Sequence, residues 1–573
     1  MKATTFAIPG YCLFRRFVLG GYVLFCLVLM GDGVLARAAE PEVWLAPVDG
    51  IKRAGQEGAG PSDFMDLFPA GAPWKTAASH VQVFEIYPQF LAKASDDMLR
   101  TVIEGLKSRH IALAVSYGLL HRPKGAAMHE GYGAEIATRD IAHLQRLGAE
   151  VRYVVADEPL LFGHFYWGEG ATPLSIADAA KDMASTARQF REAFPNVRIG
   201  MDDPVMLYRP GEWEPAMREF LEVYRKEFGE PMGFVRLECA SFPVREWLPR
   251  YIAAEKFLRS VGVPFGELIT GDASDASDAI WVQKAEERYV TWESEGRSAP
   301  GQVVFQSWMP RPTRILPEND PDTLTHLLNG YFRDRTRLTL TRDAGVLRGR
   351  LVDASGAPVA GGHVEVTAIA GFEEQSMVHR VIRCPVPADA RFVEIGLRIG
   401  VEGSPVGKAH LTMGATKYEE KEGDGGRVFD FAEGLKGWGR KGTAEVSPSH
   451  DAGMAGVKID AEAGRTLLLN SKLLPVTGGR EAMFTFDVQV QADTETGYLA
   501  MFFFDSSKKV VHRMQEPLVT EISSGVRELV TDANGNFELG LTGSELRGAR
   551  EYRFRYGGDL GRRCALATVP GAK

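Results

Sequence analysis

The sequence predicts an α/β fold, a (β/α)8 TIM barrel over residues 40–342, followed by all-β modules. Two observations support this fold class. In the first part of the chain, short apolar stretches alternate with amphipathic helical patterns, as parallel strands joined by helices require. After residue 342, the helical patterns give way to short alternating strands separated by Gly, Asp and Asn turns, which is typical of antiparallel sheets.

The N-terminal segment, residues 1–38, has the layout of a secretory signal peptide. Basic residues, among them Arg15 and Arg16, precede the apolar run FVLGGYVLFCLVLMG, and small residues follow at Ala36 and Ala38. The run is shorter than the roughly 20 apolar residues that span a bilayer, and a retained membrane anchor is the alternative hypothesis. We expect this segment to be removed and the mature chain to be secreted or periplasmic, without membrane insertion.

Charge and cysteine content narrow the classes of partner. The formal net charge is −9, and loss of the signal segment, which holds four basic residues and one acidic residue, makes it −12. An acidic chain without basic clusters does not suit nucleic acid or anionic membranes as partners. The remaining cysteines, Cys239, Cys384 and Cys564, have no C-x-x-C spacing, which argues against a zinc or redox motif. Cys384 and Cys564 can pair in an oxidising compartment.

The barrel prediction depends on the number and order of the strands. Eight strand patterns alternate with helical patterns over roughly 300 residues, which matches the size of a (β/α)8 barrel. The competing doubly wound sheet would carry a Gly-rich phosphate loop after its first strand, and the sequence has none there. The expected strands are VWLAPVDG at 43, VQVFEIYP at 81, IALAVSYG at 111, VRYVVADEP at 151, VRIGMDDP at 197, FVRLECA at 234, PFGELITGD at 264 and VVFQSWMP at 303.

Beyond the barrel, two separated segments resemble one small module. The stretch RGRLVDASGAPVAGGHVEVTA (348–368) resembles the opening hairpin of carboxypeptidase regulatory-like β-sandwiches, and TDANGNFEL (531–539) resembles their later turn. The resemblance implies a β-sandwich built from residues 345–370 and 525–570. The intervening residues, 371–524, are long enough to form an inserted domain.

The inserted segment resembles the jelly-roll carbohydrate-binding modules. The resemblance is carried by VFDFAEGLKGWGRKG (428–442), YLAMFFFDSSKKVV (498–511) and VPADARFVEIGLRIG (386–400), although the last of these looks like a late strand and comes first. It implies a weak glycan site that uses exposed aromatic side chains such as Trp438 or Tyr498.

In a barrel of this kind, functional groups lie at the C-terminal ends of the strands. Those ends are rich in carboxylates and aromatic rings, with Glu85, Asp202 and Asp272 among them. Carboxylates accept hydroxyl hydrogens and flat rings cover the C–H faces of a pyranose, so we expect a polysaccharide or oligosaccharide substrate. The candidate substrate-binding residues are Asp49, Tyr87, Tyr117, Asp203, Glu238 and Trp308.

Other chemistries find little support in the sequence. It contains no G-x-S-x-G nucleophile elbow, no H-E-x-x-H zinc helix and no Walker loop. Glu158, Asp203 and Glu238 would suit the divalent ion of a sugar isomerase, a hypothesis that export from the cytoplasm weakens. The stretch GDASDASD (271–278) lacks the glycine and the distal glutamate of an EF-hand loop. We therefore predict neither a metal nor a cofactor.

Two strand ends resemble the large clan of retaining barrel glycosidases. ADEP (156–159) resembles the Asn-Glu-Pro at the end of their fourth strand, and QSWMP (306–310) resembles the end of their eighth. The resemblance implies that Glu158 is the general acid and base and that Trp308 forms the floor of the central sugar subsite. Two departures are that Asp157 replaces the asparagine and that Glu267 lies earlier in its strand than the nucleophile usually does.

Three functional hypotheses follow. Glycoside hydrolysis needs a carboxyl group that stays protonated, and a like charge at Asp157 would raise the pKa of Glu158. In a retaining hydrolase Glu267 would be the nucleophile. Asp157 and Glu158 also resemble the pair of barrel N-acetylhexosaminidases, in which the aspartate orients the substrate's own 2-acetamido group. The third hypothesis is a non-catalytic, cell-surface glycan-binding protein.

Overall fold

The computed structural model describes most of the chain between residues 41 and 571. The described residues are 41–49, 61–125, 130–166, 172–208, 211–238, 244–272, 275, 277–293, 300–307, 311–343, 345–371, 374–399, 409–420, 427–429, 435–436, 438–449, 456–461, 467–492, 498–517, 522–541, 549 and 551–571.

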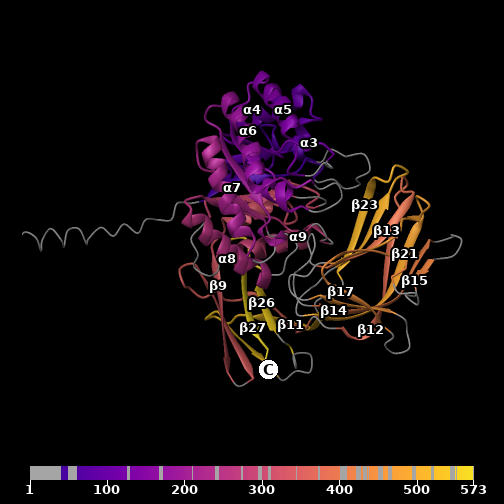
Figure 1. Cartoon of the computed structure of the whole chain (residues 1–573). Coiled ribbons are helices and arrows are strands. Elements are labelled where there is room, and N and C mark those ends of the chain that lie inside the picture. The colour runs from indigo at the N-terminus through magenta and orange to yellow at the C-terminus, as the bar shows by residue number, and fades with distance from the viewer. Residues whose placement is uncertain are drawn as a thin grey trace, which may run out of the picture. The chain divides into compact units, whose positions relative to one another are not determined.

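The N-terminal part is a closed barrel of eight parallel strands, each paired with the next in chain order (Figure 1). The barrel closes where β1 pairs with β8, with Glu42 opposite Gln302 and Ala46 opposite Gln306. The predicted (β/α)8 fold class is confirmed. The strands are β1 (Glu42–Ala46), β2 (Val83–Ile86), β3 (Ala112–Tyr117), β4 (Val151–Ala156), β5 (Arg198–Asp203), β6 (Val235–Leu237), β7 (Phe265–Ile269) and β8 (Gln302–Gln306).

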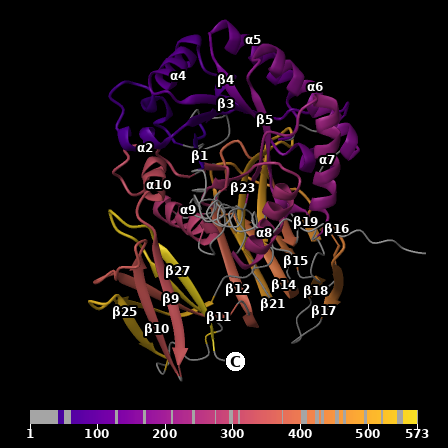
Figure 2. The ribbon, with the colours of Figure 1, turned by 90° about the vertical axis from the view of Figure 1, so that its left-hand side faces the viewer.

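Helices surround these strands, as the view in Figure 2 shows for α4 to α7 outside β3 to β5. Ser95 and Ser175 precede α4 and α6 and accept hydrogen bonds from Met98 N and Asp178 N, which satisfies backbone donors that a helix start leaves free. The helical elements are η1 (Phe64–Leu67), α2 (Lys75–His80), α3 (Pro88–Leu91), α4 (Asp96–Ser108), α5 (Ala134–Arg146), η2 (Leu161–Phe165), α6 (Ile176–Ala193), η3 (Val205–Leu207), α7 (Trp213–Phe228), α8 (Val244–Ser260), α9 (Asp278–Glu293) and α10 (Leu324–Tyr331).

Each barrel strand presents alternate side chains to the lumen and to the helix layer, because side chains alternate along a strand. In β4, Tyr153 and Val155 belong to the apolar cluster inside the barrel, together with Trp44 of β1. Val154 and Ala156 belong to the larger cluster between strands and helices. This alternation decides which strand-end residues can reach a site at the barrel mouth.

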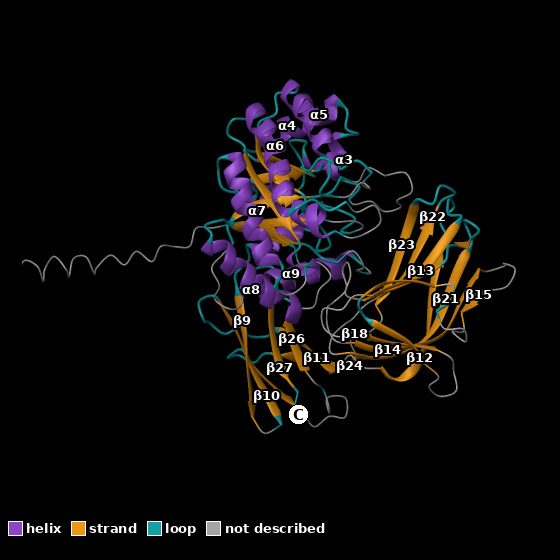
Figure 3. Ribbon diagram, viewed as in Figure 1, coloured by secondary structure: helices purple, strands orange, loops and turns teal. Residues whose placement is uncertain are grey.

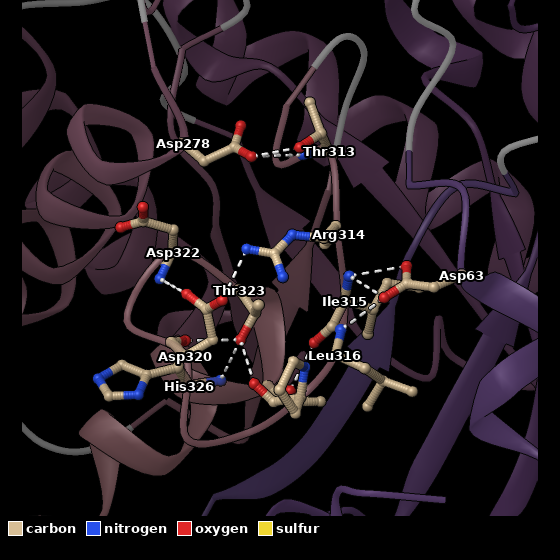
Figure 4. A network of polar contacts seen from close by, with 12 residues as sticks. Asp63, Asp278, Thr313, Arg314, Ile315, Leu316, Asp320, Asp322, Thr323 and His326 are labelled. Atoms are coloured by element: carbon tan, nitrogen blue, oxygen red, sulfur yellow. Dashed lines mark hydrogen bonds and ion pairs between the residues drawn. The ribbon is translucent and has the colours of Figure 1, made fainter.

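The segment after β8 is held by a network of carboxylates (Figure 4). Asp63 accepts hydrogen bonds from the backbone N–H groups of Ile315 and Leu316, at distances between 2.8 and 3.1 Å. Asp278, the first residue of α9, accepts from Thr313 N at 3.1 Å. The segment from 311 to 323 is therefore tied both to α9 and to the chain that precedes η1.

After the barrel, the described secondary structure is all strand (Figure 3). One three-stranded and one four-stranded sheet share an apolar core that includes Leu347, Val366, Phe537 and Phe554. Strand β10 pairs directly with β25, so the two segments expected to form one module lie in one sheet system. These strands are β9 (Thr336–Asp343), β10 (Val346–Asp353), β11 (His363–Gly371), β24 (Ile522–Val530), β25 (Asn536–Gly540), β26 (Glu551–Tyr556) and β27 (Ala565–Pro570).

The chain between β11 and β24 forms two further antiparallel sheets of six strands each, around a separate core. Trp438 is partly buried against that core. The predicted domain boundaries and the jelly-roll assignment stay predictions. The strands are β12 (Glu374–Pro385), β13 (Phe392–Ile399), β14 (Ala409–Glu420), β15 (Arg427–Phe429), β16 (Trp438–Gly442), β17 (Glu445–Ser449), β18 (Gly456–Ala461), β19 (Leu467–Ser471), β20 (Leu474–Pro475), β21 (Glu481–Ala492), β22 (Tyr498–Phe504) and β23 (Val510–Pro517).

The structure bears on the pairing of Cys564 and on the length of the helices. Cys564 is a buried free thiol, so the possible disulfide with Cys384 is not formed. Within the described ranges, we find no helix with the length and apolar character needed to cross a membrane.

Candidate active site

Carboxyl groups gather at the C-terminal ends of β4, β5 and β6. Asp157 and Glu158 follow β4 directly, Asp202 and Asp203 end β5, and Glu238 follows β6. The backbone N–H of Asp157 donates to Tyr117 O at 2.9 Å, and that of Glu238 donates to Asp203 O at 3.3 Å. These bonds extend the pairing of β3 with β4 and of β5 with β6 past the last strand residues, and so fix the backbone at Asp157 and Glu238.

Glu158 occupies an unusual backbone conformation. Its φ is 44°, in the left-handed region that non-glycine residues rarely adopt. Its carbonyl accepts a hydrogen bond from Phe162 N at 3.1 Å, and only 8% of the residue is exposed. Strain of this kind is found at functional sites, where the surrounding structure imposes it.

Glu158 and Glu238 form a hydrogen-bonded carboxyl pair. Burial raises the pKa of Glu158 well above its usual range, and the charges of Glu238, Glu130, Asp157 and Asp203 raise it further. Burial also raises the pKa of Glu238, while the hydrogen bond from Glu158 lowers it. Two carboxyls that share a hydrogen bond need a proton between them, and these environments place that proton on Glu158.

Asp157 is half-buried on the lumen side of the same turn. Burial raises its pKa well above the usual range, and the charges of Glu130, Asp202 and Glu238 add to the effect. The adjacent like charge expected from the sequence is present, but it is a smaller cause of the raised pKa of Glu158 than burial or Glu238.

Asp203 is fully buried, and both of its oxygens are occupied. Tyr208 donates to Oδ2 at 2.8 Å, and Trp213 Nε1 donates to Oδ1 at 2.6 Å. Burial raises the pKa of Asp203 to about 7. Both oxygens of Asp203 already accept protein hydrogen bonds, so this carboxyl has a structural role next to the other strand-end carboxyls.

Beneath the carboxyls, a buried cation lies inside the barrel. Arg236 Nη1 donates to Glu85 Oε2 at 2.7 Å and lies 3.5 Å from Asp202 Oδ1. The Tyr87 hydroxyl accepts from Gln306 Nε2 at 2.7 Å. Burial raises the pKa of Asp202 to about 8, although Arg236 opposes this shift. Our sequence analysis missed Arg236, yet in FVRLECA it lies two residues before Glu238 and so faces the same side of the strand.

Two predicted site residues face away from the lumen. Glu267 alternates with Phe265 and Ile269, which belong to the cluster between strands and helices. The hydroxyl of Tyr117 donates to Asp140 Oδ2 on α5 at 3.1 Å. The structure therefore does not bring Glu267 or Tyr117 to Glu158, and the reason is the register of each side chain along its strand.

Two further predicted residues, Asp49 and Asp272, also lie just after barrel strands. Asp49 follows β1 and is 7% exposed. Asp272 follows β7 and is bound by Arg288 and, at 2.9 Å, by Lys284 Nζ, which ties Asp272 to α9. Trp308 lies outside the described residues. In the part of the chain that the structure describes, no three His, Cys, Asp or Glu side chains are placed to hold a metal ion.

Comparisons with known proteins give structural similarities only. No protein-family model matches the chain, and no curated protein matches its sequence. Among solved structures, the intracellular xylanase TsXylA from Thermoanaerobacterium saccharolyticum has 11% identity and a TM-score of 0.33, covering 48% of this chain and 90% of that chain. A glucosidase from Croceicoccus marinus has 8% identity and a TM-score of 0.34, covering 78% and 95%. BuGH86 in complex with neoagarooctaose has 10% identity and a TM-score of 0.34, also covering 78% and 95%. At these identities and TM-scores, the similarities do not bear on what this chain binds or cleaves.

Proposed function

We propose that this chain is an exported glycoside hydrolase that acts on a polysaccharide or oligosaccharide. The observation that supports this proposal is the hydrogen-bonded pair of the buried Glu158 and the half-buried Glu238 at the C-terminal end of the barrel. Cleavage of a glycosidic bond needs one carboxyl that donates a proton to the leaving oxygen and a second that acts on the anomeric carbon or on water. When the environments of two carboxyls give them different pKa values, one can carry the proton while the other is ionised, which fits these roles.

Glu158 is the general acid in this proposal, and Glu238 replaces Glu267 as its partner. The charge of Arg288 lowers the pKa of Glu238, which favours its carboxylate form. Glu158 transfers its proton to the glycosidic oxygen, while the Glu238 carboxylate stabilises the cation that develops at the anomeric carbon. Carboxyl groups in such enzymes stand about 5 Å or more apart, so substrate entry must open the hydrogen bond between these two.

The substrate-assisted route remains a second candidate, because a specific observation favours it. Asp157 lies on the lumen side next to Glu158, whereas Glu267 faces the helix layer. An aspartate in this place is positioned as in the barrel hexosaminidases, where it orients a 2-acetamido group. In that case the substrate carries N-acetylated sugars, and Glu238 binds substrate rather than forming a bond to it.

Asp157→Asn is expected to separate the two routes. If Glu238 is the partner, Asp157→Asn keeps near-normal turnover and Glu238→Gln loses about 10² or more. If the route is substrate-assisted, Asp157→Asn causes the larger loss, and only 2-acetamido substrates are cleaved. Turnover measured for both variants on the same panel of glycans decides between them. Glu267→Gln is the matched control, and its inactivation in a folded protein would contradict the assignment of Glu238.

The release of reducing ends separates an enzyme from a glycan-binding protein. The mature chain, beginning after residue 38, is incubated with a panel of neutral, N-acetylated and acidic polysaccharides. We expect new reducing ends from at least one of them. Retention of a glycan without any cleavage, across the pH range from 4 to 9, would support the non-catalytic alternative.

A further inference from the structure

The chain that follows β3 folds back against the turn that carries Asp157 and Glu158. Leu120 N donates to Gly131 O at 3.0 Å, and Gly133 N donates to Leu120 O at 3.0 Å. The hydroxyl of Tyr132 donates to Phe162 O at 3.3 Å. These bonds join residues 131–133 to Leu120, just after β3, and to η2, so the adjacent Glu130 has a defined place beside the turn.

Two glycines allow this close approach. A Cβ at Gly131 would lie 2.8 Å from Phe162 Cβ and 3.4 Å from Glu158 O, and a Cβ at Gly118 would lie 2.3 Å from Glu130 O. Contacts below 3 Å are ones that real side chains do not make, so any other residue would push the loop away. The backbone at Gly131, the residue next to Glu130, is therefore packed directly on the turn of the proposed acid, and Glu130 itself packs on Gly118.

We propose that Glu130 is a positioning residue that keeps Glu158 in its proton-bearing form, and so sustains the general acid at the working pH. The inference rests on the proposed function. Glu130 acts through Glu158, since it is an exposed side chain at the rim while Glu158 is buried. A negative charge beside a carboxylic acid makes loss of its proton less favourable.

The groups around Glu158 support this role. Burial is the largest cause of its raised pKa, followed by Glu238 on β6, Glu130 on the loop, Asp157 in the same turn and Asp203 on β5. The hydroxyl of Tyr208, which donates to Asp203, also feels the charge of Glu158, and Arg288 is the cation that acts on Glu238. Glu130 has the largest charge effect on Asp157 as well. Of these carboxylates, Glu130 alone is exposed, so a change there replaces no buried group.

The direction of the expected change follows from the charge. Glu130→Gln removes a negative charge, which lowers the pKa of Glu158, so the acid loses its proton at a lower pH. The alkaline limb of the pH–rate profile for unactivated glycans should therefore move to lower pH, while turnover on the acidic side stays within about twofold. Glu130→Asp keeps the charge and should restore the limb. Because salt screens exposed charges, raising the salt concentration should move the wild-type limb in the same direction.

A second measurement does not depend on activity. A group whose pKa is raised in the folded state stabilises the fold below its unfolded pKa, and this contribution is lost as pH rises through the folded pKa. The melting temperature of the wild type should therefore fall over that range, and Glu130→Gln should reduce the fall. Glu135→Gln, which removes an exposed charge in the first turn of α5, is the matched control and should leave the fall unchanged.

The outcomes separate this inference from the proposed function. If Glu130→Gln gives the same alkaline limb of the pH–rate profile and the same melting curve as Glu135→Gln at low salt, the role of Glu130 is overturned. This holds even if the chain cleaves glycans. If the chain cleaves none, the melting curves still decide whether Glu130 holds the proton on Glu158. In an Asp157→Asn background, where the effect of Glu130 on Asp157 is removed, Glu130→Gln should still reduce the fall in melting temperature, and the absence of any effect there would assign the role of Glu130 to Asp157.

Discussion

Glu158→Gln is expected to lower the turnover of glycans with poor leaving groups by about 10²–10⁴. The amide has nearly the shape of the carboxylic acid, yet it cannot give up a proton to the departing oxygen. Burial and the surrounding carboxyls keep that proton on Glu158 in the wild type, so the loss should be present across the pH range in which the enzyme works. Steady-state turnover with natural glycans measures the effect.

Leaving-group dependence is the control for this prediction. Substrates with activated leaving groups depart without a proton, so they should lose far less turnover in Glu158→Gln. The melting temperature should change little, because the variant keeps the shape of the side chain. Equal losses with both kinds of substrate, or full activity on an unactivated glycan, would mean that Glu158 is not the acid.

Arg236→Met is expected to lower the free energy of unfolding of the barrel by about 3–5 kcal/mol. Arg236 is fully buried, lies 4.0 Å from the ring centre of Trp44, and pairs with Glu85 at 2.7 Å. Removal of the cation leaves the Glu85 carboxylate inside the barrel without its partner, next to the carboxyl of Asp202. Gly266 leaves room for the arginine side chain, because a Cβ at this position would lie 2.9 Å from Arg236 Cγ.

Denaturant unfolding followed by tryptophan fluorescence measures this change. Trp438 is the only one of the nine tryptophans that lies after residue 342, so the signal reports mainly on the barrel. Lys181→Met is the matched control in the barrel, because Lys181 of α6 makes an exposed ion pair with Asp178 at 3.2 Å and its loss should change the free energy of unfolding far less. Adding Glu85→Gln to Arg236→Met should recover part of the loss. A loss in Arg236→Met no larger than that in Lys181→Met would contradict a stabilising role for the buried pair.

The sequence by itself determined the fold class and part of the site. The apolar strand patterns and the helical periodicity between them were enough for the barrel, because both signals are local and recur along the chain. The same reasoning placed Asp157, Glu158 and Glu238 at strand ends, where parallel strands of a barrel deliver their side chains to one mouth.

Only the tertiary structure decided which strand-end residues face the lumen. Glu267 and Tyr117 face the helices, because a shift of one residue along a strand moves a side chain to its other face. A buried strand of a parallel barrel is apolar on both faces, so its sequence pattern does not show which face a residue takes. Arg236 and Glu130 needed the structure for a different reason. The contact of Arg236 with Glu85 joins residues 151 positions apart, and the approach of Glu130 to Glu158 depends on how a loop packs, which no local pattern in the sequence encodes.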